Sequence, residues 1–314
     1  MEGFYHSVSA VLVLIILMLV GYFMSWRGWM GPDEKRFLGK FIFNIAIPCN
    51  CLSGVLDRLE REMLEEAVGL LALAAVLMAG TVLLSMAAAT ALHLPRNRWG
   101  VFVAMGGMSN CLFVGLPMGR EIFGDICIPY IMVYYLVNAL YIQTIGISVI
   151  QWSGTGIGTS KRGIWPFIKQ LLSKPPVLTI FASVAMLLAG IRPPEVIMSV
   201  SGYISSSVAP LALIYIGYVV YELGLKNLRL ERGLSTMLVI RLAIAPAMCL
   251  LLCSLMGVEG LARDVFAMES ALPVISQAPV LAGNFGADDH YAAIGSCLST
   301  LACFITMPVL MLFL

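Results

Sequence analysis

Residues 271–289 read ALPVISQAPVLAGNFGADD, a long apolar segment that contains two prolines, a serine and a glutamine. Residues 116–125 read LPMGREIFGD and repeat its main features. Pro117 and Pro279 each precede a Phe-Gly pair with five residues between them, and acidic residues follow both pairs. Proline removes a backbone donor and disturbs the carbonyl four residues back. Both stretches therefore predict a broken helix at matching places, with an offset, 279 minus 117, of 162.

A second pair of prolines has the same offset. Asn44 stands four residues before Pro48, and Ser206 stands four residues before Pro210, where 210 minus 48 is again 162. Matched pairs at one offset indicate an internal repeat. The sequence predicts two five-helix units, residues 1–152 and 175–314, joined by a cytoplasmic linker at 153–174. An odd number of spans in each unit makes the second copy inverted across the membrane.

The composition places the chain in a bilayer. Hydrophobic residues make up 60% of the chain and charged residues 12%, and the mean hydropathy is +0.93. A soluble globular protein has about 45–50% hydrophobic and about 25% charged residues. This apolar content fills roughly nine or ten segments of about 20 residues. It argues against a soluble enzyme, a single-anchor protein and a disordered scaffold, and long unbroken runs argue against a β-barrel. A net charge of +1 gives no polycation for nucleic acid.

Charge and proline or glycine clusters divide the chain into ten apolar segments, separated by loops too short for a second folded domain. The predicted fold is an all-α polytopic membrane protein of ten transmembrane helices, in which broken helices 4 and 9 cross. The predicted spans are 5–25, 37–56, 67–92, 99–119, 126–151, 175–190, 195–221, 234–257, 264–283 and 290–313.

Positive charge predicts the orientation, because Lys and Arg accumulate on the cytoplasmic side. With the N-terminus outside, thirteen Lys and Arg residues lie at inward span ends and five at outward ends. All five tryptophans also fall at inward span ends, where interfacial aromatic residues are expected. The sequence thus favours a multi-pass protein of the cell membrane with both termini outside. The first apolar run follows Glu2 and precedes Arg27, so we expect a span and not a cleaved signal peptide.

The polar residues of the two broken helices are the predicted substrate site. Free N–H groups at half-helix N-termini carry partial positive charge and suit an anion such as a carboxylate. The alternative is polar contact between helices without a ligand. The predicted site residues are Ser109, Asn110, Gly115 and Pro117 in the fourth span, with Pro273, Ser276, Gln277 and Pro279 in the ninth.

Two ionisable residues are predicted at membrane depth, where such residues are functional candidates. Glu269 either binds a proton or cation for coupling or pairs near the outer interface. Arg241 either contributes charge to an anion site or snorkels and pairs with Glu222.

The fifth span and the proline motifs supply further candidates. Tyr134 and Asn138 share one helix face, which either lines the cavity or packs against a neighbour. Asn44, Pro48 and Pro210 are predicted at structural breaks, with a direct substrate role for Asn44 as the alternative.

Signatures of other chemistry are weak. The eight cysteines lack C-x-x-C pairs and are expected as small core residues. Three dispersed histidines and the lack of H-E-x-x-H and G-x-S-x-G motifs argue against a metal site and a catalytic site. GTGIGTSKRG, at 154–163, does not satisfy the phosphate-loop pattern. We therefore expect no enzyme activity and no cofactor.

The chain resembles the auxin efflux carrier family, which includes the plant auxin exporters and bacterial carriers of malonate or malate. The resemblance covers nearly the whole chain and rests on FIFNIAIP at 41–48, SNCLFVGLPMGREIFG at 109–124 and ALPVISQAPVLAGNFGADD at 271–289. It implies ten spans in two inverted repeats, a fold similar to that of the bile acid:sodium symporters, and a crossing of spans 4 and 9 at which Asn110, Pro117 and Pro279 match. It also implies a homodimer. Where the family pattern leads us to expect an asparagine in span 9, this chain has Gln277.

The predicted function is secondary transport of a small organic anion, a carboxylate such as malonate, malate or an auxin-like acid, by alternating access. Uniport, proton coupling through Glu269 and sodium coupling through backbone carbonyls all remain open. The alternatives are a sodium-coupled symporter of the bile acid type and, from another class, a ligand-binding membrane sensor or a channel.

Overall fold

The fold was examined in a computed structural model that describes residues 2–58, 61–154, 175–224 and 229–314. The described residues are helical throughout, apart from short connections and one isolated β-bridge, which confirms the all-α prediction. The α-helices of the first half are α1 (Glu2–Trp26), α2 (Pro32–Phe41), α3 (Ile47–Arg58), α4 (Arg61–Ala91), α5 (Arg96–Gly107), α6 (Leu116–Phe123), α7 (Ile128–Tyr141) and α8 (Ile147–Ser153). Those of the second half are α10 (Pro175–Ala189), α11 (Glu195–Ser206), α12 (Val208–Leu223), α13 (Leu234–Val239), α14 (Ala245–Met256), α15 (Gly260–Ser270), α16 (Ala278–Phe285) and α17 (Asp289–Leu310).

Six helical segments in the described part of the chain are long and apolar enough to cross a membrane: Pro32–Asp57, Ala67–Ala91, Asp125–Ser153, Glu195–Glu222, Leu234–Met256 and Asp289–Leu310. Ile15–Trp26 and Pro175–Ala189 are shorter apolar helices. The fourth and ninth predicted spans are interrupted, as α5 with α6 and as α15 with α16. These findings agree with a polytopic membrane protein, while ten spans and inverted repeats stay predictions. The linker predicted at 153–174 lies almost wholly outside the described residues.

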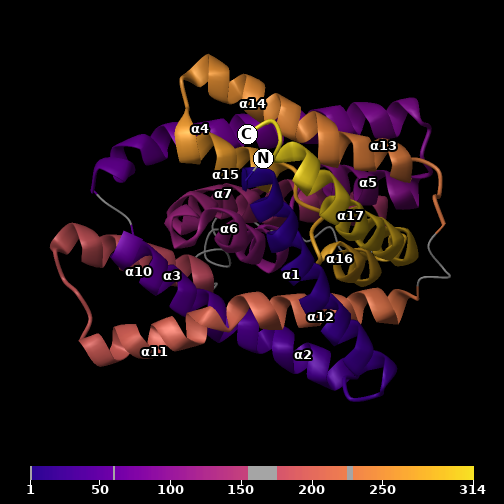
Figure 1. Cartoon of the computed structure of the whole chain (residues 1–314). Coiled ribbons are helices and arrows are strands. Elements are labelled where there is room, and N and C mark those ends of the chain that lie inside the picture. The colour runs from indigo at the N-terminus through magenta and orange to yellow at the C-terminus, as the bar shows by residue number, and fades with distance from the viewer. Residues whose placement is uncertain (1, 59–60, 155–174, 225–228) are drawn as a thin grey trace.

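The contacts between helices divide them into two groups, which we call the first and the second bundle. In the first bundle α1 packs on α12, α3 packs on α10 and α11, and α2 packs on α12. In the second bundle α5 packs on α4, α8 and α17, α16 packs on α17, and α15 packs on α14 and α7. Figure 1 shows α2, α11 and α12 along one side of the molecule and α4, α13 and α14 along the other. Contacts of α1 and α12 with α6 and of α3 with α7 join the bundles.

Prolines explain three of the π-helical segments that interrupt the α-helices. The segments η1 (Ile42–Ala46), η2 (Cys111–Gly115) and η6 (Ile240–Ile244) each end two residues before a proline: Pro48, Pro117 and Pro246. A proline leaves the carbonyl four residues back without its donor and clashes with it. Widening the turn before the proline to a π-helix relieves that clash. The fourth, η4 (Ile142–Gly146), contains no proline, and a Cβ added at Gly146 would lie 2.8 Å from Met108 Sδ.

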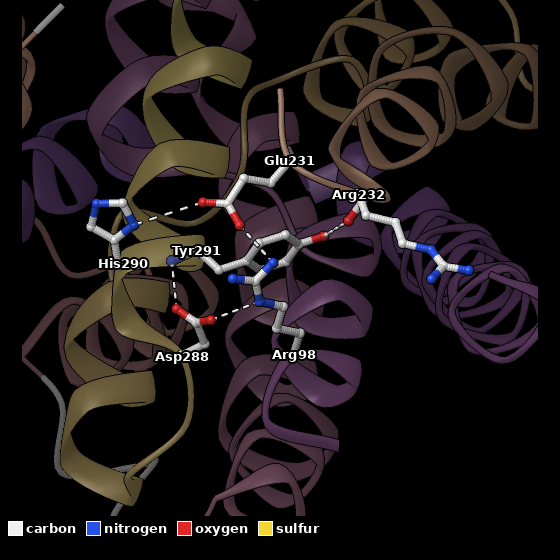
Figure 2. Close-up of polar contacts among 6 residues, drawn as sticks. All are labelled: Arg98, Glu231, Arg232, Asp288, His290 and Tyr291. Carbon is white, nitrogen blue, oxygen red and sulfur yellow. Dashed lines mark hydrogen bonds and ion pairs between the residues drawn. The ribbon is translucent and has the colours of Figure 1, made fainter. Parts of the chain in front are cut away.

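A charged cluster fixes one end of the second bundle (Figure 2). Arg98, in the first turn of α5, bonds Glu231 through Nη1 at 2.5 Å and Asp288 through Nε at 2.7 Å. The other oxygen of Asp288 accepts the N–H of Tyr291 at 2.9 Å and so caps α17. The guanidinium of Arg98 also lies over the Tyr291 ring, 4.9 Å from its centroid. One arginine thereby joins the start of α5, the segment before α13 and the start of α17.

Candidate functional site

The two broken helices meet through extended backbone. Helix α5 ends at Gly107 and η2 begins at Cys111, while α15 ends at Ser270 and α16 begins at Ala278. Ser109 and Val274 form an antiparallel β-bridge between the two interruptions. The Asn110 N–H donates to the Pro273 carbonyl at 2.9 Å. We call residues 108–110 and 271–277 the crossing segments.

Side chains from two other helices satisfy the backbone of the crossing segments. Asn138 of α7 accepts the Ser109 N–H at 3.2 Å and donates to the Ser109 carbonyl at 2.7 Å. Ser299 of α17 accepts the Val274 N–H at 3.1 Å. Asn138 and Ser299 are both buried. Backbone outside a helix persists at membrane depth only when protein or a water-filled cavity satisfies its polar groups, so these contacts hold the segments in place.

Two cavities lie beside the crossing segments, both between the bundles. The first has a volume of about 40 Å³ and the second about 130 Å³. Asn110 and Ser276 line both of them, so the same polar residues face both cavities. The first is lined by Phe43, Ser109, Asn110, Cys111, Leu112, Phe113, Tyr135, Asn138, Ala139, Ile142, Gln143, Ile275, Ser276 and Gln277. The second is lined by Lys35, Asn110, Tyr215, Ile216, Val219, Val220, Glu222, Val274, Ser276, Pro279, Val280, Ala293, Ser296, Cys297 and Thr300.

A half-helix begins at the wall of each cavity. Cys111, Leu112 and Phe113 form the first turn of η2, which continues into α6, and all three line the first cavity. Pro279 and Val280, in the first turn of α16, line the second. The N–H groups of the first turn of η2 have no acceptor within their own helix. At the start of α16 the Ala278 N–H donates to the Ile275 carbonyl and Pro279 has no N–H, so the helix dipole is the main source of partial positive charge there. Each cavity therefore receives a positive half-helix terminus suited to an anion.

The two ionisable residues predicted at membrane depth lie against the crossing segments. The side chain of Arg241, in η6, is 1% exposed, and Glu269, in α15, is 0% exposed. Arg241 donates from Nε to the Leu272 carbonyl at 2.9 Å and from Nη2 to the Glu269 carbonyl at 3.3 Å. Arg241 thus caps the C-terminal end of α15, where a cation complements the helix dipole. It does not pair with Glu222, which pairs with Lys35 instead.

Three other predicted residues, Gly115, Pro117 and Tyr134, are buried and line neither cavity. Gly115, in η2, packs so closely on α15 that an added Cβ would overlap Glu269 Oε1 and lie 2.5 Å from Leu272 Cδ1. Pro117 is buried in the first turn of α6 and lines neither cavity. Tyr134 packs edge-on against Phe266 with centroids 5.4 Å apart, and its neighbour Tyr135 lines the first cavity instead.

The predicted break residues lie in the first bundle. Asn44 donates to the Lys40 carbonyl at 2.8 Å within its own helix and lines neither cavity. Pro48 follows η1 in α3, and Pro210 stands in the first turn of α12, just after α11 ends.

Sequence reasoning missed an ion pair in the wall of the second cavity. Lys35 Nζ of α2 lies 2.5 Å from Glu222 Oε2 of α12. The Tyr218 hydroxyl donates to the other carboxylate oxygen at 3.3 Å, and Lys35 lies 5.3 Å from the Tyr218 ring centroid. Lys35 and Glu222 are 187 residues apart and stand at span ends, where charged residues are ordinary. No local pattern distinguished them.

Comparison with known proteins identifies the family. The profile of the membrane transport protein family matches residues 6–311. The chain belongs to this family. It is 26% identical over 312 residues to an uncharacterized transporter of Methanothermobacter thermautotrophicus, with 98% of each chain covered. It is also 23% identical over 275 residues to an uncharacterized transporter of Methanocaldococcus jannaschii, covering 84% of this chain and 85% of the relative.

The match confirms the resemblance to the auxin efflux carriers drawn from the sequence motifs. As a member of the membrane transport protein family, the chain is a multi-pass membrane transporter. Both crossing segments lie within the matched range.

Proposed function

We propose that this protein is a secondary carrier of a small organic anion, a carboxylate of the size of malonate, malate, lactate or an auxin-like acid, and that the anion binds at the crossing segments. One observation carries the proposal. Two half-helix N-termini open into two cavities, and Asn110 and Ser276 belong to both cavity walls. An anion held by these residues would meet positive backbone dipoles from either side.

The two bundles supply a means of alternating access. Both cavities have one wall from the first bundle, through Phe43 or through Lys35 and Tyr215, and one wall from the crossing segments of the second bundle. Movement of one bundle against the other would enlarge one cavity and close the other while the binding residues stay together. The hydrogen bonds from Asn138 and Ser299 keep the crossing segments rigid during such a movement.

The proposed topology has ten spans in two inverted repeats, with both termini outside. On this orientation Lys35 and Glu222 stand at the cytoplasmic end of the second cavity. Lys35 would attract the anion there, and Glu222 would compete with the anion for Lys35. The Arg98 cluster stands on the same side and would preserve the shape of the second bundle.

Transport in proteoliposomes tests the proposal. Purified protein is reconstituted, and uptake of labelled malonate, malate, lactate and indole-3-acetate is followed with and without sodium and proton gradients. We expect saturable uptake of at least one acid. Asn110→Ala should lower it by tenfold or more, since the loss of about 1.4 kcal/mol of binding gives a factor of ten.

Asn44→Ala is the matched control, because Asn44 hydrogen-bonds only within its own helix turn and lines neither cavity. It should retain uptake. Folded protein that moves none of the four acids, or equal uptake by Asn110→Ala and the unchanged protein, would contradict the proposed site.

A further inference from the structure

Glu269 is a fully buried carboxyl group that no strong hydrogen-bond donor among the described residues satisfies. Its nearest polar neighbour is the thiol of Cys111. The groups that face Glu269 and Arg241 from the surrounding elements are the thiols of Cys111, Cys127 and Cys303 and the phenol of Tyr134. Thiols are weak donors, so none of these groups replaces the hydration that an ionised carboxylate loses on burial.

Arg241 brings a permanent positive charge close to Glu269 and to the anion site. An arginine side chain is not deprotonated in proteins. Its hydrogen bonds go to the Glu269 and Leu272 carbonyls and not to the Glu269 carboxylate. Leu272 directly precedes Pro273, whose carbonyl accepts the Asn110 N–H. The charge of Arg241 therefore acts on the carboxyl group and on the crossing segments alike.

We propose that Glu269 is a proton-binding site linked to anion binding at the crossing segments through the charge of Arg241, so that the carrier moves one proton together with the anion. The inference rests on the proposed function and names its coupling ion. The proton passes from water to the Glu269 carboxylate, which becomes a neutral carboxylic acid. No covalent bond other than this O–H bond is made or broken.

Charge balance gives the linkage its direction. When Glu269 is ionised, it compensates Arg241, and an incoming anion adds an uncompensated negative charge to a dry region. When Glu269 is protonated, the charge of Arg241 is free to balance the anion. Electrostatic interactions are strong in such surroundings, so each ligand favours the other, and the linkage is reciprocal. Couplings of this kind change affinity by about 5- to 150-fold, and we expect a stronger affinity at lower pH within that range.

The packing of Glu269 ties proton exchange to the conformational change. The carboxyl group lies against Gly115 of η2, where an added Cβ would overlap it. Separation of η2 from α15 would open a path from water to Glu269. That separation is a movement of the two broken helices that form the anion site, so proton release and anion release share one opening step.

Infrared spectroscopy tests the proton site without any substrate. Spectra of purified protein are compared between about pH 5 and pH 8, the range of the physiological proton switch. We expect the carbonyl stretch of a protonated carboxyl group, absent from Glu269→Gln and retained in Glu259→Gln, which changes an exposed residue at the start of the same helix. A spectrum in which Glu269→Gln removes no such band at any pH would overturn the proposal.

Proton uptake tests the linkage. Malonate, malate, lactate and indole-3-acetate are each added to the protein in weakly buffered dye solution, at a pH well above the titration of the acids themselves. We expect about one proton taken up per anion bound and none by Glu269→Gln, whose anion affinity should lose its pH dependence. Anion binding without proton uptake, or uptake driven by a sodium gradient alone, would overturn the coupling while leaving the proposed function intact. If none of the four acids binds, the proposed function fails instead, and the infrared result still decides the proton site.

Discussion

Replacing Asn138 by leucine should destabilise the protein strongly, because one side chain satisfies both backbone groups of Ser109. Asn138 accepts the Ser109 N–H at 3.2 Å and donates to its carbonyl at 2.7 Å. Leucine fills a similar volume but offers neither group. Ser109 is 1% exposed, so its N–H would then be buried without Asn138, and its carbonyl would keep only the thiol of Cys111, a weak donor, at 3.7 Å.

The magnitude follows from the two lost contacts. A buried polar group left unsatisfied costs about 1–3 kcal/mol, so two predict a loss of about 2–6 kcal/mol in the free energy of unfolding. Hydrogen bonds between membrane helices average only about 0.6 kcal/mol when other partners replace them, which would give about 1 kcal/mol. A loss of unfolding free energy well above about 1 kcal/mol therefore means that neither water nor another polar group replaces Asn138 at the crossing segments.

The assay is reversible unfolding in mixed micelles, with transport measured on the same preparations. Asn44→Leu is the control, because it removes a single exposed hydrogen bond to Lys40 and should cost less than about 1 kcal/mol. Asn138→Leu should also lose uptake. Equal stability of the two variants, or a loss below about 1 kcal/mol for Asn138→Leu, would refute the role given to Asn138.

Three further substitutions have defined outcomes. Gly115→Ala should lose about 1–3 kcal/mol of unfolding free energy by overpacking against Glu269, whereas Gly202→Ala, where an added Cβ meets nothing within 4 Å, should be neutral or slightly stabilising. Equal melting temperatures of the two variants would contradict the close packing at Gly115. Asp288→Ala should be about 1 kcal/mol less stable than Asp288→Asn, because both variants lose the ion pair with Arg98 but asparagine keeps the cap on α17. If chemical unfolding showed Asp288→Ala to be the more stable variant, the cap would be refuted. Lys35→Met should cost at most about 1 kcal/mol in stability, since the ion pair of Lys35 is partly exposed, but it should reduce anion uptake from the cytoplasmic side. Unchanged uptake would exclude Lys35 from the path of the anion.

Much of the helical architecture could be predicted from the sequence, because apolar length determines which segments remain in the bilayer. Both helices are interrupted near their paired prolines: Pro279 lies in the first turn of α16, whereas Pro117 lies in α6, six residues after the half-helix begins at Cys111 of η2. The non-helical geometry between the half-helices could not be predicted locally. The crossing segments leave the helices where Ser109 pairs with Val274, where Asn110 bonds Pro273, and where Asn138 and Ser299 satisfy the backbone, and such bonding depends on the tertiary fold.

The candidate site was predicted in its polar centre and missed at its edges. Five predicted polar residues line the first cavity: Ser109, Asn110, Ser276, Gln277 and Asn138. Polar groups beside a helix break at membrane depth must be buried in protein or line a cavity. Ser299 was missed because a serine inside a membrane helix usually bonds its own preceding turn. Helical spacing placed Tyr134 and Asn138 on one face, but Tyr134 packs on Phe266, because a helix deep in a bundle is surrounded on several faces.

Access to position 276 from the two sides of the membrane tests the central claim most directly. Ser276→Cys is combined with Cys49→Ala, which removes the only cysteine in the described residues that is not buried, and Cys49→Ala alone is the control. An impermeant thiol reagent is applied from each side of proteoliposomes, with and without malonate, malate, lactate or indole-3-acetate. We expect reaction from both sides and protection by the transported acid. Reaction from one side only, or reaction that no transported acid slows, would contradict alternating access to an anion site at the crossing segments.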